Sequence, residues 1–76
     1  MIDLAAIRRA TGLTQTELAA NLGVGQAQIS KIERQNDMLI STLASYLTAL
    51  GASARLTITV NGQTAEHDLT TSEGEA

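Results

Sequence analysis

The side chains that could do chemistry lie at two places in this 76-residue sequence. His67 stands between Glu66 and Asp68, but no second His and no Cys exists to complete a metal site, and no Ser stands in a nucleophile turn. We therefore expect no enzyme activity, no metal and no cofactor, with His67 a half-exposed strand residue. The other place is a polar run whose amide, hydroxyl and cationic groups could hydrogen-bond to a partner: Gln26, Gln28, Ser30, Lys31 and Arg34.

The polar run lies on the second of two short amphipathic helices that the sequence predicts around a glycine turn. Thr14 is followed three residues later by Glu17, which predicts a capping box at the start of the first of these helices. That helix should end at Gly23, and the next should cover residues 26–35. Polar residues on one helix face are by themselves typical of a solvated surface. Two helices joined by about three residues have the spacing of a helix-turn-helix, however, and this favours a helix that enters the major groove of DNA.

Two further helices complete the expected helical part. Asp3 is a candidate N-cap for a helix over residues 4–11, and Ser41 is one for a helix over residues 42–50. Gly12 and Gly51 are the corresponding stops. Apolar residues at helical spacing predict a buried stripe on each helix, with Tyr46 beside the last of them: Leu4, Ile7, Leu18, Ala19, Leu22, Ile29, Ile32, Leu43, Leu47 and Leu50.

After Gly51 the hydrophobic period changes from 3.6 to 2, which predicts a strand over residues 55–60 and a β-hairpin turning at Asn61-Gly62. That turn sets Val60 opposite Gln63, Ile58 opposite Ala65, Leu56 opposite His67 and Arg55 opposite Asp68. Leu56, Ile58 and Val60 then form an apolar face that needs a cover. The fourth helix of the same chain could cover it, and so could the hairpin of a second chain.

The expected fold class is mainly α: a four-helix domain with a helix-turn-helix at residues 1–51, followed by the hairpin at 52–69. The hairpin would serve dimerisation or partner contact, and residues 70–76 would form a disordered acidic tail.

A chain this small is near the lower limit for an unaided core, so we expect an oligomer. The formal charge is −3, with residues 1–37 neutral and the acids concentrated after Asn61. No apolar run suits a membrane span, and the N-terminus is unlike a secretory signal, which is compatible with a cytoplasmic protein.

Residues 15–34 resemble the helix-turn-helix of the Cro/repressor (XRE) family. The resemblance rests on Gln15, Leu18-Ala19, Leu22-Gly23-Val24, Ile29, Ile32 and Glu33. It implies a partly buried ion pair between Arg8 and Glu33. The chain departs from the family at Gln35, where a glycine is common, and in having few cations, so that modest affinity per monomer is expected.

The same resemblance implies which residues would bind DNA. Gln15 would donate to a phosphate and buttress Gln26, whose amide would bond an adenine edge. Ala27 would lie against a thymine methyl group, and Ser30 and Lys31 would reach bases or phosphate. The phosphate contacts that position the helix would come from Gly25, Gln28 and Arg34.

Over residues 4–69 the chain resembles the small antitoxins of HigA-like toxin-antitoxin modules. Relatives of this kind commonly carry a segment ahead of the first helix, which here is expected to begin at residue 4. The resemblance implies that toxin and antitoxin together repress their own promoter. The small core and the uncovered hairpin face predict a homodimer, which would bind a palindromic operator with its recognition helices about 34 Å apart. The implied protein partner is a RelE/HigB-like ribonuclease toxin. Two alternatives remain: a stand-alone phage or plasmid repressor without a toxin, and a non-DNA adaptor that binds a basic protein through its acidic end.

Overall fold

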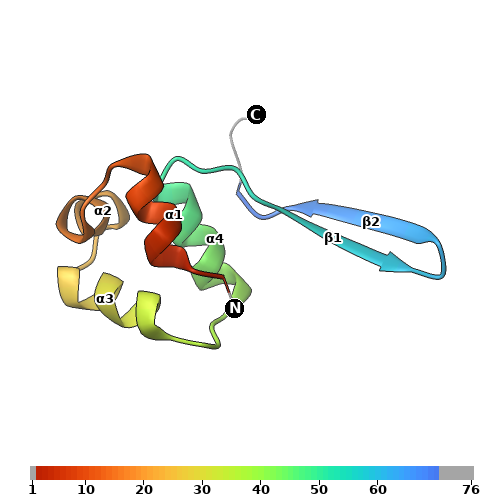
Figure 1. Ribbon diagram of the computed structural model, residues 1–76, viewed down its shortest axis with the longest axis horizontal. Coiled ribbons are helices and arrows are strands. Elements are labelled where there is room, and N and C mark those ends of the chain that lie inside the picture. The colour runs from red at the N-terminus through yellow and green to blue at the C-terminus, as the bar shows by residue number, and fades with distance from the viewer. Residues whose placement is uncertain (1, 71–76) are drawn as a thin grey trace.

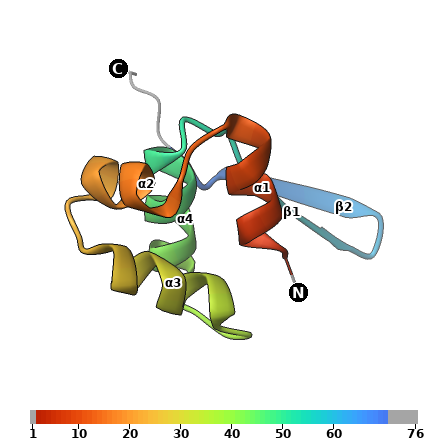
Figure 2. The same ribbon diagram turned by 60° about the vertical axis from the view of Figure 1, so that its left-hand side comes forward.

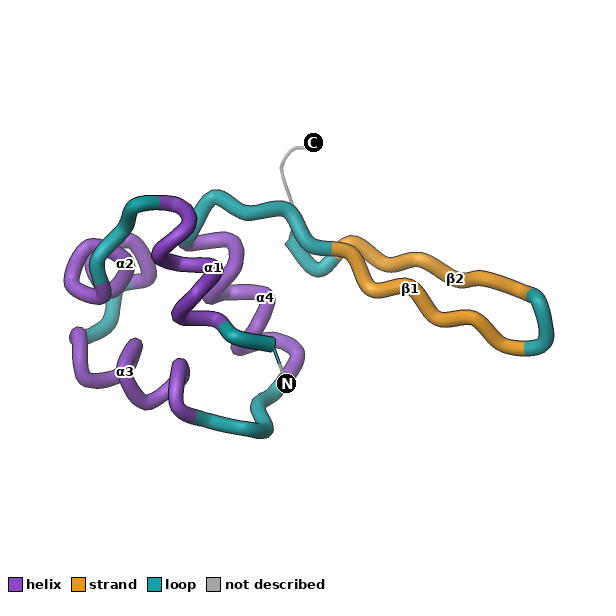
Figure 3. The backbone as a smooth tube through the Cα atoms, in the orientation of Figure 1, coloured by secondary structure: helices purple, strands orange, loops and turns teal. Residues whose placement is uncertain are grey.

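Four helices followed by a two-stranded antiparallel hairpin make up the part of the chain that the computed structural model describes, residues 2–70 (Figures 1 and 3). The fold class predicted from the sequence is therefore confirmed. In order, the elements are α1 (Leu4–Thr11), α2 (Gln15–Leu22), α3 (Gln26–Arg34), α4 (Ile40–Ala49), β1 (Arg55–Val60) and β2 (Gln63–Asp68).

Local capping chemistry sets the ends of the first two helices. The Asp3 carboxylate accepts a hydrogen bond from the Ala6 N–H at 3.0 Å and so begins α1. The predicted capping box of α2 is present: the Thr14 hydroxyl accepts from the Glu17 N–H at 3.1 Å, and the Glu17 carboxylate accepts from the Thr14 N–H at 2.9 Å. Gly23 ends α2 at φ +81°, while a Cβ added there would meet nothing within 4 Å. Glycine is therefore favoured at the turn for its backbone conformation and not for lack of space.

Three helix boundaries differ from those expected, and one of them is the end of α4, which lies at Ala49 and not at residue 50. Ser41 does not cap α4: the helix begins at Ile40, its N-cap is Leu39, and no side chain caps it. Met38, just before this start, packs against the core, and tertiary packing here outweighs the local preference for a hydroxyl cap. Helix α3 ends at Arg34, because Gln35 leaves the helix at φ −77° and ψ 140°. This extended exit needs no glycine, which accounts for Gln35 where the family commonly has one.

The core lies among the four helices, and α2 packs against both α3 and α4 (Figure 2). Tyr46, expected beside the stripe of α4, is instead fully buried at its centre. Leu22, Leu43 and Ile7 were expected in the buried stripes and are only partly buried. The fully buried residues are Leu4, Leu18, Ala19, Ile29, Ile32, Tyr46, Leu47 and Leu50.

The hairpin has the predicted register throughout, from Val60 opposite Gln63 to Arg55 opposite Asp68. Asn61 and Gly62 both have positive φ, 51° and 79°, as a two-residue hairpin turn of the favoured type requires. Arg55 Nε lies 3.2 Å from Asp68 Oδ1, and Arg55 Nη1 lies 3.3 Å from Glu66 Oε1. These ion pairs are exposed, so they add little stability, and they agree with the register that the turn sets.

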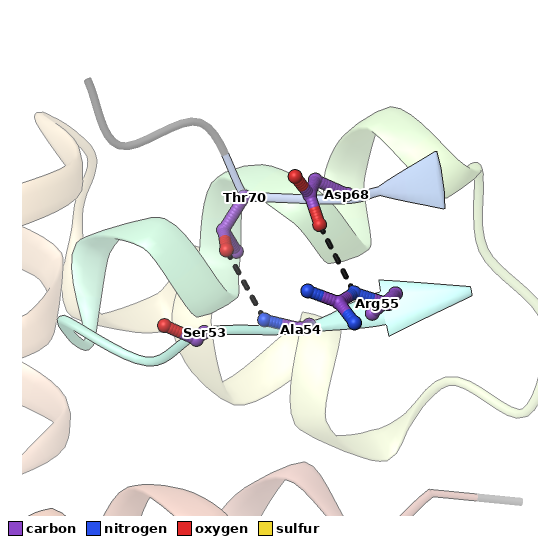
Figure 4. A pocket seen from close by; sticks show the side chains of 5 residues that line it. All are labelled: Ser53, Ala54, Arg55, Asp68 and Thr70. Atoms are coloured by element: carbon purple, nitrogen blue, oxygen red, sulfur yellow. Dashed lines mark hydrogen bonds and ion pairs between the residues drawn. The ribbon is translucent and has the colours of Figure 1, made fainter. Parts of the chain in front are cut away.

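The two strands extend away from the helical domain, which makes the molecule 42 Å long but only 31 by 21 Å across (Figures 1 and 3). Two hydrogen bonds close the base of the hairpin. Leu69 N–H donates to the Ala54 carbonyl at 2.9 Å. Ala54 N–H donates to the Thr70 hydroxyl at 3.1 Å (Figure 4). Both strands are exposed along their whole length. The apolar face of the hairpin is therefore not covered by α4 of the same chain, which was one of the two possibilities that the sequence left open.

Thr70 is the last described residue, so the rest of the predicted acidic tail lies outside the described residues. None of the described helices is long and apolar enough to cross a membrane. Between residues 2 and 70, no three His, Asp or Glu side chains gather closely enough to hold a metal ion.

Candidate nucleic-acid interface

Helix α3 lies at one edge of the helical domain and divides into a buried and an exposed face (Figures 1 and 2). Ile29 and Ile32 are buried against the core. Ser30 is half-buried, and the other residues with predicted DNA contacts on this helix and its N-cap are exposed: Gly25, Gln26, Ala27, Gln28, Lys31 and Arg34. No side chain caps the N-terminus of α3, so its first N–H groups are available to an anion such as a phosphate.

Gln15, at the start of α2, connects the exposed face of α3 to the interior. Gln26 Nε2 donates a hydrogen bond to Gln15 Oε1 at 2.6 Å, and Gln15 Nε2 donates to Glu33 Oε1 at 2.9 Å. Gln15 therefore contacts Gln26, as the buttressing role requires. One of its two amide hydrogens is taken by Glu33, which leaves the other for a phosphate.

Arg8 and Glu33 form the predicted ion pair, which ties α1 to the end of α3. Arg8 Nε lies 2.7 Å from Glu33 Oε2, and the two side chains are only 11% and 5% exposed. Arg8 Nη1 also donates to the Leu13 carbonyl at 2.9 Å. The Tyr46 hydroxyl lies 2.6 Å from Glu33 Oε2 and 3.2 Å from the Leu4 carbonyl. A phenol has a single hydroxyl hydrogen, so Tyr46 donates to the Glu33 carboxylate, which is both the nearer and the charged acceptor.

The sequence did not indicate that Tyr46 belongs to this cluster. The one feature of the sequence that could have drawn attention to Tyr46 is that it is the single aromatic residue of the chain, on a helix whose other inward residues are aliphatic. A buried phenol hydroxyl requires a hydrogen-bond partner, and Glu33 supplies it.

Few cations lie near the exposed face. Helix α3 contributes Lys31 and Arg34, and Arg34 Nη1 donates to the Ser30 hydroxyl at 2.7 Å. Arg8 is neutralised by Glu33 and faces inward, so it adds nothing to the surface charge. The geometry is that of a helix which can present amide and hydroxyl groups to a groove with modest electrostatic attraction.

The family model described as "Helix-turn-helix" matches residues 4–55, which is more than half of the chain. The chain belongs to the XRE-type helix-turn-helix family. Two solved structures resemble this helix-turn-helix protein over nearly their whole length, and both are HigA antitoxins. One, concerned with DNA bending induced by a unique dimerization of HigA, has a TM-score of 0.75 and 35% sequence identity, over 88% of this chain and 93% of that one.

The other solved structure, the DNA-bound antitoxin HigA3, has a TM-score of 0.80 and 35% identity, and the match covers 99% of this chain and 97% of that one. The match therefore includes the hairpin as well as the helices of this helix-turn-helix protein. No curated protein sequence matches it.

In this helix-turn-helix protein, the side chains that surround Glu33 keep it ionised: Arg8, Gln15 and Tyr46. Burial raises the pKa of Glu33, but hydrogen bonds from Arg8, Tyr46 and Gln15 and the charge of Arg8 outweigh it and hold the pKa below its ordinary value of 4.5. The hydrogen bond to Glu33 raises the pKa of Arg8 against the opposing effect of burial. Burial, and then the bond to Glu33, raise the pKa of Tyr46, so that its hydroxyl remains a donor.

We expect the stability of this helix-turn-helix protein to fall in acid partly through Glu33. A carboxylate whose folded pKa is lowered contributes stability above its unfolded pKa and loses that contribution as the pH falls through the folded value. The free energy of unfolding, measured by urea denaturation between about pH 5 and about pH 3, should therefore decrease more steeply in the wild type than in Glu33→Gln. The remaining carboxylates titrate in both proteins, so equal slopes would show that Glu33 is not held ionised.

Proposed function

We propose that this protein is a sequence-specific DNA-binding repressor and the antitoxin of a type II toxin-antitoxin module. The observation that carries the proposal is the exposed face of α3, on which Gln26 is held by Gln15 from the start of α2. The likeness to two HigA antitoxins, one of them bound to DNA, supports it over nearly the full chain.

In this proposal α3 lies in the major groove and Gln26 reads an adenine. The free part of the Gln26 amide provides a donor and an acceptor, as the adenine edge requires. Ala27 lies against a thymine methyl group, and Ser30 and Lys31, about one turn later, reach the next bases or a phosphate. Gly25, Gln28, Arg34 and Gln15 contact the backbone and set the position of the helix without reading sequence.

The hairpin supplies the second half of the proposal. Leu56, Ile58 and Val60 are 38%, 46% and 59% exposed, and they lie on one face of the hairpin. We propose that this face pairs two chains, so that two copies of α3 meet a palindromic operator about 34 Å apart. Pairing compensates for the few cations of each copy, because both half-sites then contribute to one binding event.

The toxin proposed for this antitoxin is a RelE-superfamily ribonuclease, which the protein would neutralise while repressing their common promoter. The test is to co-express the chain with the product of the short reading frame beside its gene. Restored growth and co-purification of the two proteins are expected. Unrelieved toxicity, or a neighbouring gene that encodes no ribonuclease, would leave a stand-alone repressor as the function.

Two substitutions on α3 should have different effects on DNA binding. Gln26→Ala should weaken binding at the cognate site by about 1–3 kcal/mol and relax the preference for one base, because a bidentate contact is lost. Arg34→Ala should weaken binding to every sequence and reduce the salt slope by about 1, because a phosphate contact is lost. Both effects are measured by titrating specific and scrambled duplexes at several salt concentrations.

Gln28→Ala is the matched control for Gln26→Ala, since it removes the same side chain from the same helix at a proposed backbone contact. It should weaken binding without changing base preference. An equal loss of specific and non-specific binding in the Gln26→Ala variant would contradict the reading role of Gln26.

A further inference from the structure

A continuous line of hydrogen bonds runs from the buried carboxylate of Glu33 to the exposed amide of Gln26. Glu33 Oε1 accepts from Gln15 Nε2 at 2.9 Å, and Gln15 Oε1 accepts from Gln26 Nε2 at 2.6 Å. The line crosses from the end of α3 through the start of α2 to the first residue of α3. It connects a side chain that is only 5% exposed to the proposed reading residue.

The chemistry of Glu33 gives this line one direction. An ionised carboxylate can only accept hydrogen bonds, so Gln15 must turn its NH₂ group to Glu33 and its oxygen to Gln26. Gln26 must then use one amide hydrogen on Gln15. What remains for a partner is the Gln26 carbonyl oxygen and one N–H, that is, one acceptor and one donor.

We propose that Glu33 is a positioning residue that determines base specificity at the site read by Gln26, although it does not itself face the DNA. This inference rests on the proposed DNA-binding function. Adenine presents one donor and one acceptor in the major groove, which complement what Gln26 has free, whereas guanine presents two acceptors. By fixing the amide of Gln26, Glu33 selects adenine over guanine.

Glu33→Gln should reverse the donor and the acceptor in both hydrogen bonds of this line while the side chains keep their positions. Oε2 of Glu33 accepts two short hydrogen bonds, from Arg8 Nε at 2.7 Å and the Tyr46 hydroxyl at 2.6 Å, whereas Oε1 accepts from Arg8 only a long bond from Nη2 at 3.4 Å. The two short bonds retain the new carbonyl oxygen at the Oε2 position, at the cost of the long bond from Nη2. The new NH₂ group then takes the position of Oε1 and faces Gln15. Gln15 turns its oxygen inward and its NH₂ outward, Gln26 turns its oxygen to Gln15, and both amide hydrogens of Gln26 become available to guanine.

The test is selection of binding sites from a randomised duplex library by the full-length chain, followed by affinity measurements. The position read by Gln26 is the one whose base preference disappears in Gln26→Ala. There the wild type should prefer adenine, and Glu33→Gln should lower the adenine-to-guanine ratio by about tenfold or more. Gln15→Leu, which breaks the line at a half-buried residue outside the core cluster, should bring the ratio close to one.

Tyr46→Phe is the matched control, because it removes a hydrogen bond from the same carboxylate but not from Oε1. It should lower stability and keep the adenine preference, whereas a merely structural role for Glu33 would make the two variants alike. The inference is overturned if the wild type prefers another base, if Glu33→Gln changes all positions equally, or if Gln15→Leu keeps the ratio. If Glu33→Gln does not fold, Gln15→Leu decides. Failure of the wild type to select any sequence would instead reject the DNA-binding function itself.

Discussion

Replacement of Arg8 by methionine should lower the free energy of unfolding at neutral pH by about 3–5 kcal/mol, the usual effect of removing one partner from a buried ion pair. The methionine fills a similar volume but leaves the Glu33 carboxylate almost fully buried with only Tyr46 and Gln15 as donors. The loss should become smaller as the pH falls, because removal of Arg8 takes away one of the causes that lower the pKa of Glu33, so that the carboxylate is protonated and becomes neutral more readily. Urea denaturation at one fixed protein concentration measures it, since association also changes stability.

Arg9→Met provides the matched control, since Arg9 is the next residue of α1 and is exposed. It should change the free energy of unfolding by less than about 0.5 kcal/mol. Adding Glu33→Gln to Arg8→Met should restore part of the lost stability, because the unpaired charge is then gone. Similar stabilities for Arg8→Met and Arg9→Met would show that the ion pair does not hold α1 to α3.

Ile58→Glu should convert the protein to a monomer and lower its affinity for operator DNA by about 100-fold or more, since the two half-sites would then be bound separately. Ile58 lies between Leu56 and Val60 along the exposed face of β1. A carboxylate at the centre of this face would have to lose its hydration when two hairpins pair, without a partner to compensate. Sedimentation and operator titration measure the two consequences.

The control for Ile58→Glu is Thr59→Glu, which adds the same charge to the next residue and therefore to the opposite face of the hairpin. It should stay dimeric and keep its operator affinity. If both the wild type and Ile58→Glu sediment as dimers, the dimer contact lies elsewhere. A wild type that is monomeric at about tens of micromolar would contradict the pairing of two chains itself.

The features that the sequence predicted well are those decided by neighbouring residues. The capping box of Thr14 and Glu17, the left-handed Gly23 and the Asn61-Gly62 turn each depend on a few adjacent side chains and their backbone preferences. The hairpin register follows from that turn, because a two-residue loop fixes every later pair. The ion pair of Arg8 and Glu33 was found through the family resemblance, since 25 residues separate its partners.

The features that the sequence did not reveal depend on how distant elements meet. The bond from Tyr46 to Glu33 joins α4 to α3, and nothing local to either residue indicates it. Helix α4 begins at Ile40, two residues after Met38, which packs against the core, and not after Ser41, as the capping preference alone predicts. The hairpin could equally have folded onto α4 by its pattern, and only the structure shows its apolar face uncovered.

The central claim, sequence-specific DNA binding, is tested most directly by titrating the chain with its own promoter duplex and with a scrambled duplex at two salt concentrations. The account predicts promoter binding tighter by about 10³-fold or more than scrambled binding, and weaker at the higher salt concentration. Equal affinity for the two duplexes, or no salt-dependent binding to either, would contradict it and favour an adaptor that retains the fold without reading DNA.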